Sequence, residues 1–311
     1  MADITFQVQP RGRPIKRLPK EITLPSTAST ADIYNHLSSK TGLSIHRLRI
    51  TNDSSVLAAS NPVSLATASL NDGTVLSVKD LGPQIAWRTV FVIEYLGPLL
   101  IHPILYFARA HLYGNPNGPG TQLDFPAPSS AQTLALVLST IHFAKRELET
   151  LFLHRFSSAT MPAFNIVKNS AHYWALAGAN IAYWVYSPTS PTASLTSDSL
   201  IVKVGLALFV IGELGNLYTH YVLANLRPAG TTTRAIPRGF GFGLVTCPNY
   251  TFEVLAWVGM CLVTLSWSTV LFTAVAGGQM LVWAQKKERR YRKEFQDKYK
   301  KKRATMIPFV A

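Results

Sequence analysis

Long apolar segments dominate the hydrophobic pattern of the chain, and each is long enough to form a helix that crosses a bilayer. These segments are Ile85 to Ala108, Ala131 to Leu153, Ala163 to Tyr186, Leu200 to Leu226 and Phe252 to Ala284. About 20 helical residues cross the apolar layer of a membrane, so the last segment is long enough for two helices, with a break expected near Ser266. The pattern predicts a mainly α-helical, polytopic membrane bundle with about six spans.

Positive charge in the connecting loops predicts the orientation of these spans, because cytosolic loops carry more Lys and Arg than loops on the other side. The predicted lumenal loops, 110–130, 187–199 and the turn near Ser266, contain neither residue type. The basic residues of the predicted cytosolic connections are Arg155, Lys168, Arg227, Arg234 and Arg238. We therefore expect both termini in the cytosol.

Residues 1–80 precede the apolar segments and have the pattern of a small soluble module. Ile4, Phe6 and Val8 alternate with polar residues, and a second extended piece ends at Leu24. A helix is expected from the 29–32 cluster to Gly42, followed by short strands around His46 to Ile50 and Thr74 to Val78.

This ββαβ order, with the closing stretch LNDGTVLSVKDLGPQI, resembles a ubiquitin-like β-grasp domain. The resemblance implies an N-terminal α+β domain at 1–80, on the cytosolic side. A transmembrane domain with a basic C-terminal tail would follow at 85–311.

Composition narrows the function classes. The chain is 48% hydrophobic and 15% charged, with a formal net charge of +14. Much of the positive charge lies at 286–303, directly after an apolar segment, which is typical of a cytosolic flank against anionic headgroups. No nucleic-acid recognition motif accompanies it, so we expect no nucleic-acid partner. The two cysteines cannot form a disulfide framework or a cysteine zinc site, and the first residues lack the pattern of a cleaved signal peptide.

Ionisable residues inside apolar segments are costly and mark candidate sites. Glu94 lies in VFVIEYLGPLLIHP, with His102 on about the same helical face. The pattern leaves two interpretations open: Glu94 belongs to a reactive site, or it is a structural acid paired with a neighbouring helix.

A second candidate is the stretch IHFAKRELETLFLHRFS, where His142, Arg146 and Glu149 share one stripe beside Lys145. On periodicity alone, an interfacial helix with a solvated face is the favoured explanation. His142 and His154 are too far apart to share a helical face, and no third ligand follows, so we expect no metal site.

A third candidate is a span in which Glu213, Asn216 and His220 recur at helical spacing. It leads into LRPAGTTTRAIPRGFGFG, whose Arg227, Arg234 and Arg238 could hold phosphates by charge-assisted hydrogen bonds. The glycines of this loop lack the strand-turn-helix setting of a Rossmann site, and the loop alone is better explained as a flexible interfacial connection.

A fourth candidate is VTCPNYTFEVLAW, where Pro248 and Asn249 predict a helix start with Asn249 as the cap. Tyr250 would lie in the first turn, near the positive helix end that stabilises a phenolate, with Glu253 close by. From the pattern alone, a tyrosine of the membrane interface is the better explanation.

Together these segments resemble the steroid 5α-reductase superfamily, most closely its trans-2-enoyl-CoA reductase branch. The motifs EYLGP, HFAKRELETLFLHRFS, GELGN, LRPAG, IPRG, CPNYTFE and IPF follow one another in order from Glu94 onward. The resemblance implies NADPH as cofactor. The implied cofactor contacts are Asn216, Arg227, Asn249, Glu253 and Tyr291, with Arg234, Lys145 and Arg146 near cofactor or CoA phosphates. His220 departs from the steroid-reducing relatives, which have an acid at this position.

The resemblance also implies a reaction. Tyr250 would donate a proton, with Glu94 as its partner, in reducing trans-2-enoyl-CoA to saturated acyl-CoA, the last step of very-long-chain fatty acid elongation. The expected location is the endoplasmic reticulum membrane, with other elongase subunits as partners. Two alternatives remain open: a steroid or polyprenol reductase on the same scaffold, or a non-enzymatic membrane scaffold whose ubiquitin-like domain recruits partners.

Overall fold

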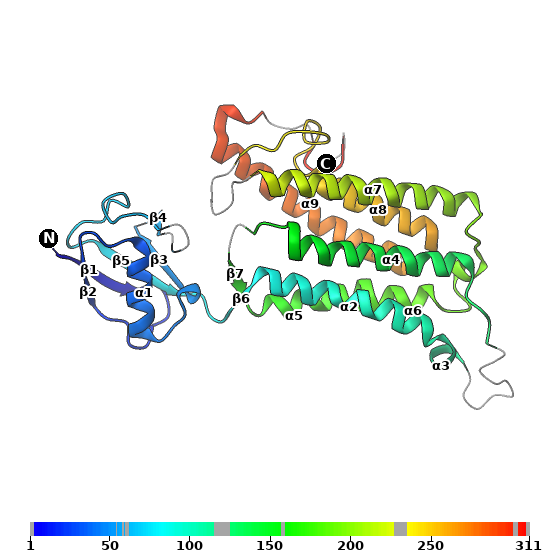
Figure 1. Ribbon diagram of the computed structural model, residues 1–311, viewed down its shortest axis with the longest axis horizontal. Coiled ribbons are helices and arrows are strands. Elements are labelled where there is room, and N and C mark those ends of the chain that lie inside the picture. The colour runs from blue at the N-terminus through cyan, green and yellow to red at the C-terminus, as the bar shows by residue number, and fades with distance from the viewer. Residues whose placement is uncertain are drawn as a thin grey trace. The chain divides into compact units, whose positions relative to one another are not determined.

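The computed structural model describes residues 3–53, 55–57, 59, 62–114, 125–156, 159–226, 235–300 and 304–308. The chain forms two compact units (Figure 1). One extends to Trp87 and includes Phe156–Asn165, and the other contains the long helices. Each unit is described by itself.

The first unit is a mixed five-stranded sheet with one helix packed on it. Its elements are β1 (Asp3–Pro10), β2 (Glu21–Pro25), α1 (Thr30–Thr41), η1 (Ile45–Arg47), β3 (Leu48–Asn52), β4 (Ser55–Val56) and β5 (Val75–Asp80). The strand order is β2-β1-β5-β3-β4, with β1 and β5 parallel and the other pairs antiparallel. Ile33 and Leu37 of α1 are fully buried against Phe6, Ile50 and Leu76 of the sheet. A short pair, β6 (Gln84–Ala86) and β7 (Thr160–Pro162), completes this unit.

Local sequence signals set the ends of α1. Ser29 and Asp32 form a capping box, in which the Ser29 N–H donates to Asp32 Oδ2 at 2.8 Å. Gly42 ends the helix with a φ of 72°, which glycine adopts without steric cost. The predicted bounds of this helix are confirmed, whereas β3 begins at Leu48 and not at His46, because His46 lies in the 3₁₀ turn η1.

An ion pair closes this turn against β5. Arg47 Nη2 lies 2.6 Å from Asp80 Oδ2. The guanidinium holds the pKa of the Asp80 carboxyl below its usual value. Asp80 is therefore already engaged by a cation.

Helices make up most of the second unit (Figure 1). They are α2 (Trp87–Phe107), α3 (Arg109–Tyr113), α4 (Ser130–Leu148) with η3 (Glu149–Leu153), α5 (Asn165–Ser170), η4 (Ala171–Asn180), α6 (Ile181–Val185), η5 (Pro191–Ser194), α7 (Leu200–Asn225), α8 (Pro248–Thr264), α9 (Trp267–Phe295) and η6 (Gln296–Lys298). The predicted break near Ser266 is confirmed, since Leu265 and Ser266 separate α8 from α9.

Three helices in the described part of the chain are long and apolar enough to cross a membrane, judged by length and composition. They are α2, α7 and the stretch Trp267–Lys298, and only 28–33% of their most apolar windows is buried inside the protein. The rest presents large apolar side chains outward, for example Phe107 and Leu200. A surface of this kind is stable in lipid, which identifies a membrane protein. The count of six spans and the orientation of the termini remain predictions.

Glycines bring α7 and α8 into backbone contact. A Cβ added to Gly205 would lie 2.7 Å from the Gly259 carbonyl oxygen, and one added to Gly259 would lie 2.6 Å from the Phe209 nitrogen. Such spacing leaves no room for a side chain, as in other membrane helix pairs with small residues at the contact. The seam fixes the distance between the two helices that carry most of the polar residues described below.

We expect Gly259→Ala to destabilise the protein by about 1–3 kcal/mol, because the added methyl overpacks this seam. Thermal unfolding of the purified protein in detergent measures the change. Gly278→Ala in α9 is the matched control, because an added Cβ there meets nothing within 4 Å. Equal melting temperatures for the two variants would contradict the tight seam.

Candidate active site

Charged side chains on one face of α4 and η3 point into the helical unit. His142 is 2% and Glu149 3% exposed, and the side chains of Lys145 and Arg146 are each 14% exposed. The interpretation of this stripe as a solvated face is therefore wrong. Helical spacing places the residues on one face, but α7 and α8 cover that face.

The facing stripe of α7 supplies the partners. Glu213, Asn216 and His220 are all buried, as their place in an apolar span predicts. Lys145 Nζ lies 2.7 Å from Glu213 Oε2 and donates to Asn216 Oδ1 at 2.7 Å. His142 Nδ1 lies 2.6 Å from the other Glu213 oxygen. The two helices are thus joined by buried, charge-assisted hydrogen bonds.

Glu149 is the shared acceptor at the end of this network. Arg146 Nη1 donates to Glu149 Oε2 at 2.8 Å, and His220 Nδ1 lies 3.0 Å from Glu149 Oε1. Arg146 also donates from Nη2 to the Tyr95 hydroxyl at 2.8 Å. Buried charges are tolerated only when paired in this way, so each member depends on the others.

The start of α8 extends the network. Asn216 Nδ2 donates to the Asn249 carbonyl oxygen at 2.9 Å and to Glu253 Oε2 at 3.0 Å. Trp257 Nε1 donates to the other Glu253 oxygen at 3.3 Å. The buried side-chain oxygen Asn249 Oδ1 has no hydrogen-bond partner among the described residues. Asn216, Asn249, Glu253 and Lys145 therefore meet in one place, with an acceptor left for a ligand.

Asn249 is not the cap of α8. The helix begins at Pro248, and Cys247 occupies the cap position. Proline suits the first helical position because its missing N–H would have no partner there. Tyr250 lies in the first turn, as the sequence predicts.

Glu94 is buried in α2, with 1% exposure, and Tyr95 and Asn169 lie beside its carboxyl. Its Oε2 has no hydrogen-bond partner among the described residues. His102 belongs to another cluster, where it bonds to the Tyr186 hydroxyl and the Ala177 carbonyl.

Within the described residues, no direct hydrogen bond joins Glu94 to Tyr250. Arg146 donates a hydrogen bond to Tyr95, the residue next to Glu94 in α2. The pairing of Glu94 with Tyr250 remains a prediction.

The side chain of Tyr250, in the first turn of α8, packs against α9. Its ring centre lies 6.5 Å from that of Trp283, and it borders an apolar cluster of Cys247, Met280, Ala284 and Met306. Tyr291 lies further along α9, where Lys287 Nζ is 5.7 Å from its ring centre and the Tyr299 ring packs edge-on against it. Tyr250 of α8 thus packs against α9, and Tyr291 lies on α9 itself.

Residues 304–308 hold the start of α8 in place. The Cys247 N–H donates to the Thr305 carbonyl at 3.0 Å, and Thr251 Oγ1 donates to the Met306 carbonyl. Sequence reasoning missed this role, and the only signal was an apolar group after the basic run. The tail contacts the helix turn that carries Tyr250.

We expect Met306→Ala to cost about 2–5 kcal/mol, because it leaves a cavity beneath the first turn of α8. Met306 is 2% exposed, whereas the neighbouring Ile307 is 37% exposed. Ile307→Ala is therefore the control, and thermal unfolding in detergent is the measurement. A smaller loss for Met306→Ala than for Ile307→Ala would show that the tail does not support α8.

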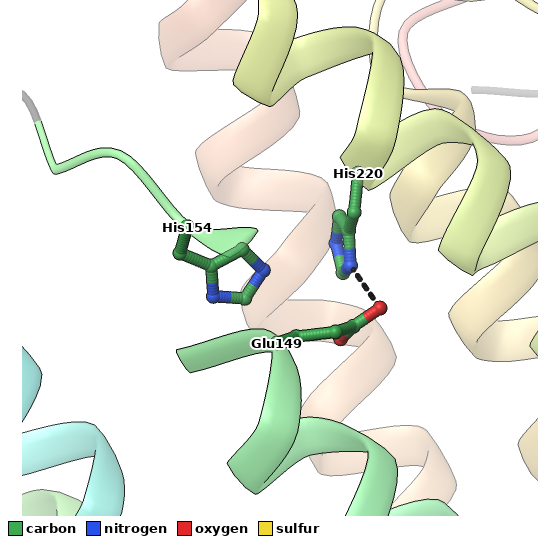
Figure 2. Close-up of side chains that lie close together, drawn as sticks. All are labelled: Glu149, His154 and His220. Atoms are coloured by element: carbon green, nitrogen blue, oxygen red, sulfur yellow. Dashed lines mark hydrogen bonds and ion pairs between the residues drawn. The ribbon is translucent and has the colours of Figure 1, made fainter. Parts of the chain in front are cut away.

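One group of side chains has the composition of a metal site. Glu149, His154 and His220 place their ligand atoms within 4.8 Å of one another (Figure 2). His142 is not part of this group, and local spacing does not reveal the group because His220 comes from α7. Figure 2 shows His220 bonded to Glu149, which also binds Arg146. Because Lys145 Nζ lies 3.8 Å from Glu149, a divalent ion here would be repelled by two cations. The absence of a metal remains a prediction.

Arg227 and Arg234 lie outside the described residues. Of the other candidates, the structure brings together Lys145, Arg146, Asn216, Asn249 and Glu253. Tyr95, His142 and Glu149 also belong to this group. Their hydrogen bonds form only when α2, α4 and α7 pack together.

Comparisons with known proteins assign the class. The family model described as 3-oxo-5-alpha-steroid 4-dehydrogenase matches residues 159–311. A very-long-chain enoyl-CoA reductase of Dictyostelium discoideum is 41% identical over 305 residues, covering 95% of this chain and 97% of that protein. A Caenorhabditis elegans protein named "probable very-long-chain enoyl-CoA reductase" is 45% identical over 242 residues, covering 76% of this chain and 75% of its own length. A human trans-2,3-enoyl-CoA reductase-like protein is 32% identical over 79% of this chain and 66% of its own.

These matches define a membrane oxidoreductase. The chain belongs to the family of very-long-chain enoyl-CoA reductases, within the wider steroid dehydrogenase group.

Proposed function

We propose that this protein reduces very-long-chain trans-2-enoyl-CoA to saturated acyl-CoA with NADPH, in the last step of the fatty acid elongation cycle. The observation that carries the proposal is the 41% identity to a very-long-chain enoyl-CoA reductase over 95% of the chain. The buried polar network supports it, because a purely anchoring bundle has no need of such costly groups.

The residues present fit a dinucleotide. Asn249 Oδ1 is an unpartnered buried acceptor suited to an amide N–H, and Lys145 and Arg146 supply positive charge. Asn216, Asn249, Glu253 and Tyr291 would hold the cofactor, with Arg227 and Arg234 as phosphate ligands. Lys145 and Arg146 would lie near the phosphates of the cofactor or of CoA, and each also binds a carboxylate. NADPH, when bound, supplies the hydride.

The protein's own part in the reaction is proton supply. After hydride addition at the β-carbon of the enoyl thioester, the Tyr250 hydroxyl donates its proton to the α-carbon. The positive end of α8 stabilises the phenolate that remains. Glu94 would orient the phenol or the thioester carbonyl by hydrogen bonding.

We further propose that the first unit is a ubiquitin-like β-grasp domain, which its strand order supports. The helical unit would span the endoplasmic reticulum membrane six times, with both termini in the cytosol and the CoA head at the cytosolic face. Other elongase subunits are its proposed partners.

The test is an assay of membranes that contain the protein, with a long-chain trans-2-enoyl-CoA and either NADPH or NADH. We expect saturated acyl-CoA to form with NADPH. A 3-oxo-Δ4-steroid is assayed in parallel, because the family model also covers steroid reduction. Conversion of the steroid alone would contradict the proposed enoyl-CoA substrate. Turnover with NADH alone would contradict NADPH as the cofactor. No turnover, together with no NADPH-dependent rise in melting temperature, would favour the scaffold.

A further inference from the structure

The outer face of the N-terminal sheet carries a basic concavity. Arg11, Arg49, Thr51 and Lys79 line a hollow of about 110 Å³. Arg49 of β3 stands directly opposite Lys79 of β5 in the antiparallel register. Arg11 follows β1, and its backbone N–H donates to the Val78 carbonyl at 2.7 Å, which keeps it beside β5.

The charges of this concavity are unbalanced. Like charges directly opposite one another on antiparallel strands repel. In the described part of this unit, only Arg47 and Asp80 reach ion-pair distance. The carboxylate nearest in sequence to Lys79 is thus already paired. The repulsion between these basic side chains destabilises the empty concavity, and a bound anion would relieve it.

The sheet fixes the backbone positions of these basic residues. Ile50 and Val78, which alternate with the basic positions along β3 and β5, are fully buried on the opposite face. The neighbouring residues on the outer face of β1 and β5 are neutral, with Gln9 Nε2 donating to Ser77 Oγ at 3.1 Å. Arg and Lys side chains that project from fixed strand positions, without a competing acid in the described part of this face, are suited to phosphate oxygens.

The short connection between β5 and α2 indicates which phosphate-containing molecule lies within reach of this surface. β5 ends at Asp80, and α2, an apolar helix long enough to cross a membrane, begins at Trp87. Seven residue steps span at most roughly 25 Å. A connection this short limits how far the sheet can move from the start of α2, so a bilayer that α2 crosses presents its headgroups to the sheet at high effective concentration.

We propose that the surface formed by Arg11, Arg49 and Lys79 binds the headgroup of an anionic phospholipid in the membrane that holds the helices. Binding at this face fixes one side of the domain toward the bilayer. The proposal stands independently of the reductase activity.

The experiment uses the full chain in nanodiscs of phosphatidylcholine, with or without phosphatidylserine. A fluorophore is attached through Val75→Cys, an exposed position of β5 on the same sheet face, in a Cys261→Ser background. A headgroup spin-labelled lipid quenches it at close range. We expect phosphatidylserine to increase quenching, and high salt to reverse the increase.

The variant R11Q/R49Q/K79Q should lower the apparent affinity for phosphatidylserine about a hundredfold, from the usual contribution of a basic residue at an anionic surface. The control R13Q/K16Q/R17Q removes the same charge from exposed positions of the β1–β2 connection and should retain the response. Equal responses of the two variants would overturn the proposal, because net charge alone would explain them. Displacement of the domain by free CoA, with no response to phosphatidylserine alone, would also overturn it in favour of a soluble phosphate. Unchanged melting temperatures show that the variants fold.

Discussion

Replacing Tyr250 with phenylalanine is expected to lower the rate of enoyl-CoA reduction by about 10²- to 10⁴-fold, the usual contribution of a general acid. The substitution removes only a hydroxyl from a half-buried side chain in the first turn of α8. The ring still packs against Trp283, so the amount of folded protein should not change.

The measurement compares the turnover rate and KM of the purified variant with those of the parent protein. A loss in turnover with little change in KM indicates a group that acts in the chemical step. Tyr221→Phe is the control, because Tyr221 is 60% exposed on α7. Full activity of Tyr250→Phe would exclude the tyrosine as proton donor while leaving the substrate assignment untouched.

Replacing Glu149 with alanine is expected to lower the free energy of unfolding by about 3–5 kcal/mol, the usual cost of removing one partner from a buried ion pair. Glu149 accepts from Arg146 and pairs with His220, so its loss leaves a buried guanidinium with Tyr95 as its remaining strong partner. Denaturant or thermal unfolding in detergent provides the measurement.

The matched control for Glu149 is Asp198→Ala. The Asp198 side chain is 90% exposed and lies 3.3 Å from Lys203, so its removal should cost less than about 1 kcal/mol. The double variant Glu149→Ala with Arg146→Met should recover part of the loss, because no unpaired charge remains. Losses that simply add in the double variant would contradict a coupled network.

The apolar pattern predicted the long helices because the length of each helix, and the break near Ser266, depend on residues that are consecutive in the sequence. It also placed Glu213, Asn216 and His220 on a buried face, since an apolar span offers no water to solvate them. The stripe of His142, Arg146 and Glu149 was misjudged for the converse reason. Periodicity shows which residues share a face, but not what covers that face.

Local sequence patterns could not predict contacts between segments that are far apart in the chain. The grouping of Glu149 with His220, and the support of α8 by Met306, each join residues more than fifty positions apart. The helix start at Pro248 was misassigned by one position, because an asparagine next to a proline suggests a cap, whereas proline itself occupies the first helical position. The family resemblance proposed roles for Asn216, Asn249 and Glu253, but not the hydrogen bonds that join them.

The glycine seam between α7 and α8 determines which parts of the site can move. Gly205 and Gly259 bring the two backbones together without intervening side chains, so α7 and α8 cannot slide or tilt past one another independently. Asn216 and Glu253 therefore travel as one rigid body. This body is joined to α4 by the hydrogen bonds of His142 to Glu213 and of Lys145 to Asn216, so any shift of α4 against it would break buried charge-assisted hydrogen bonds.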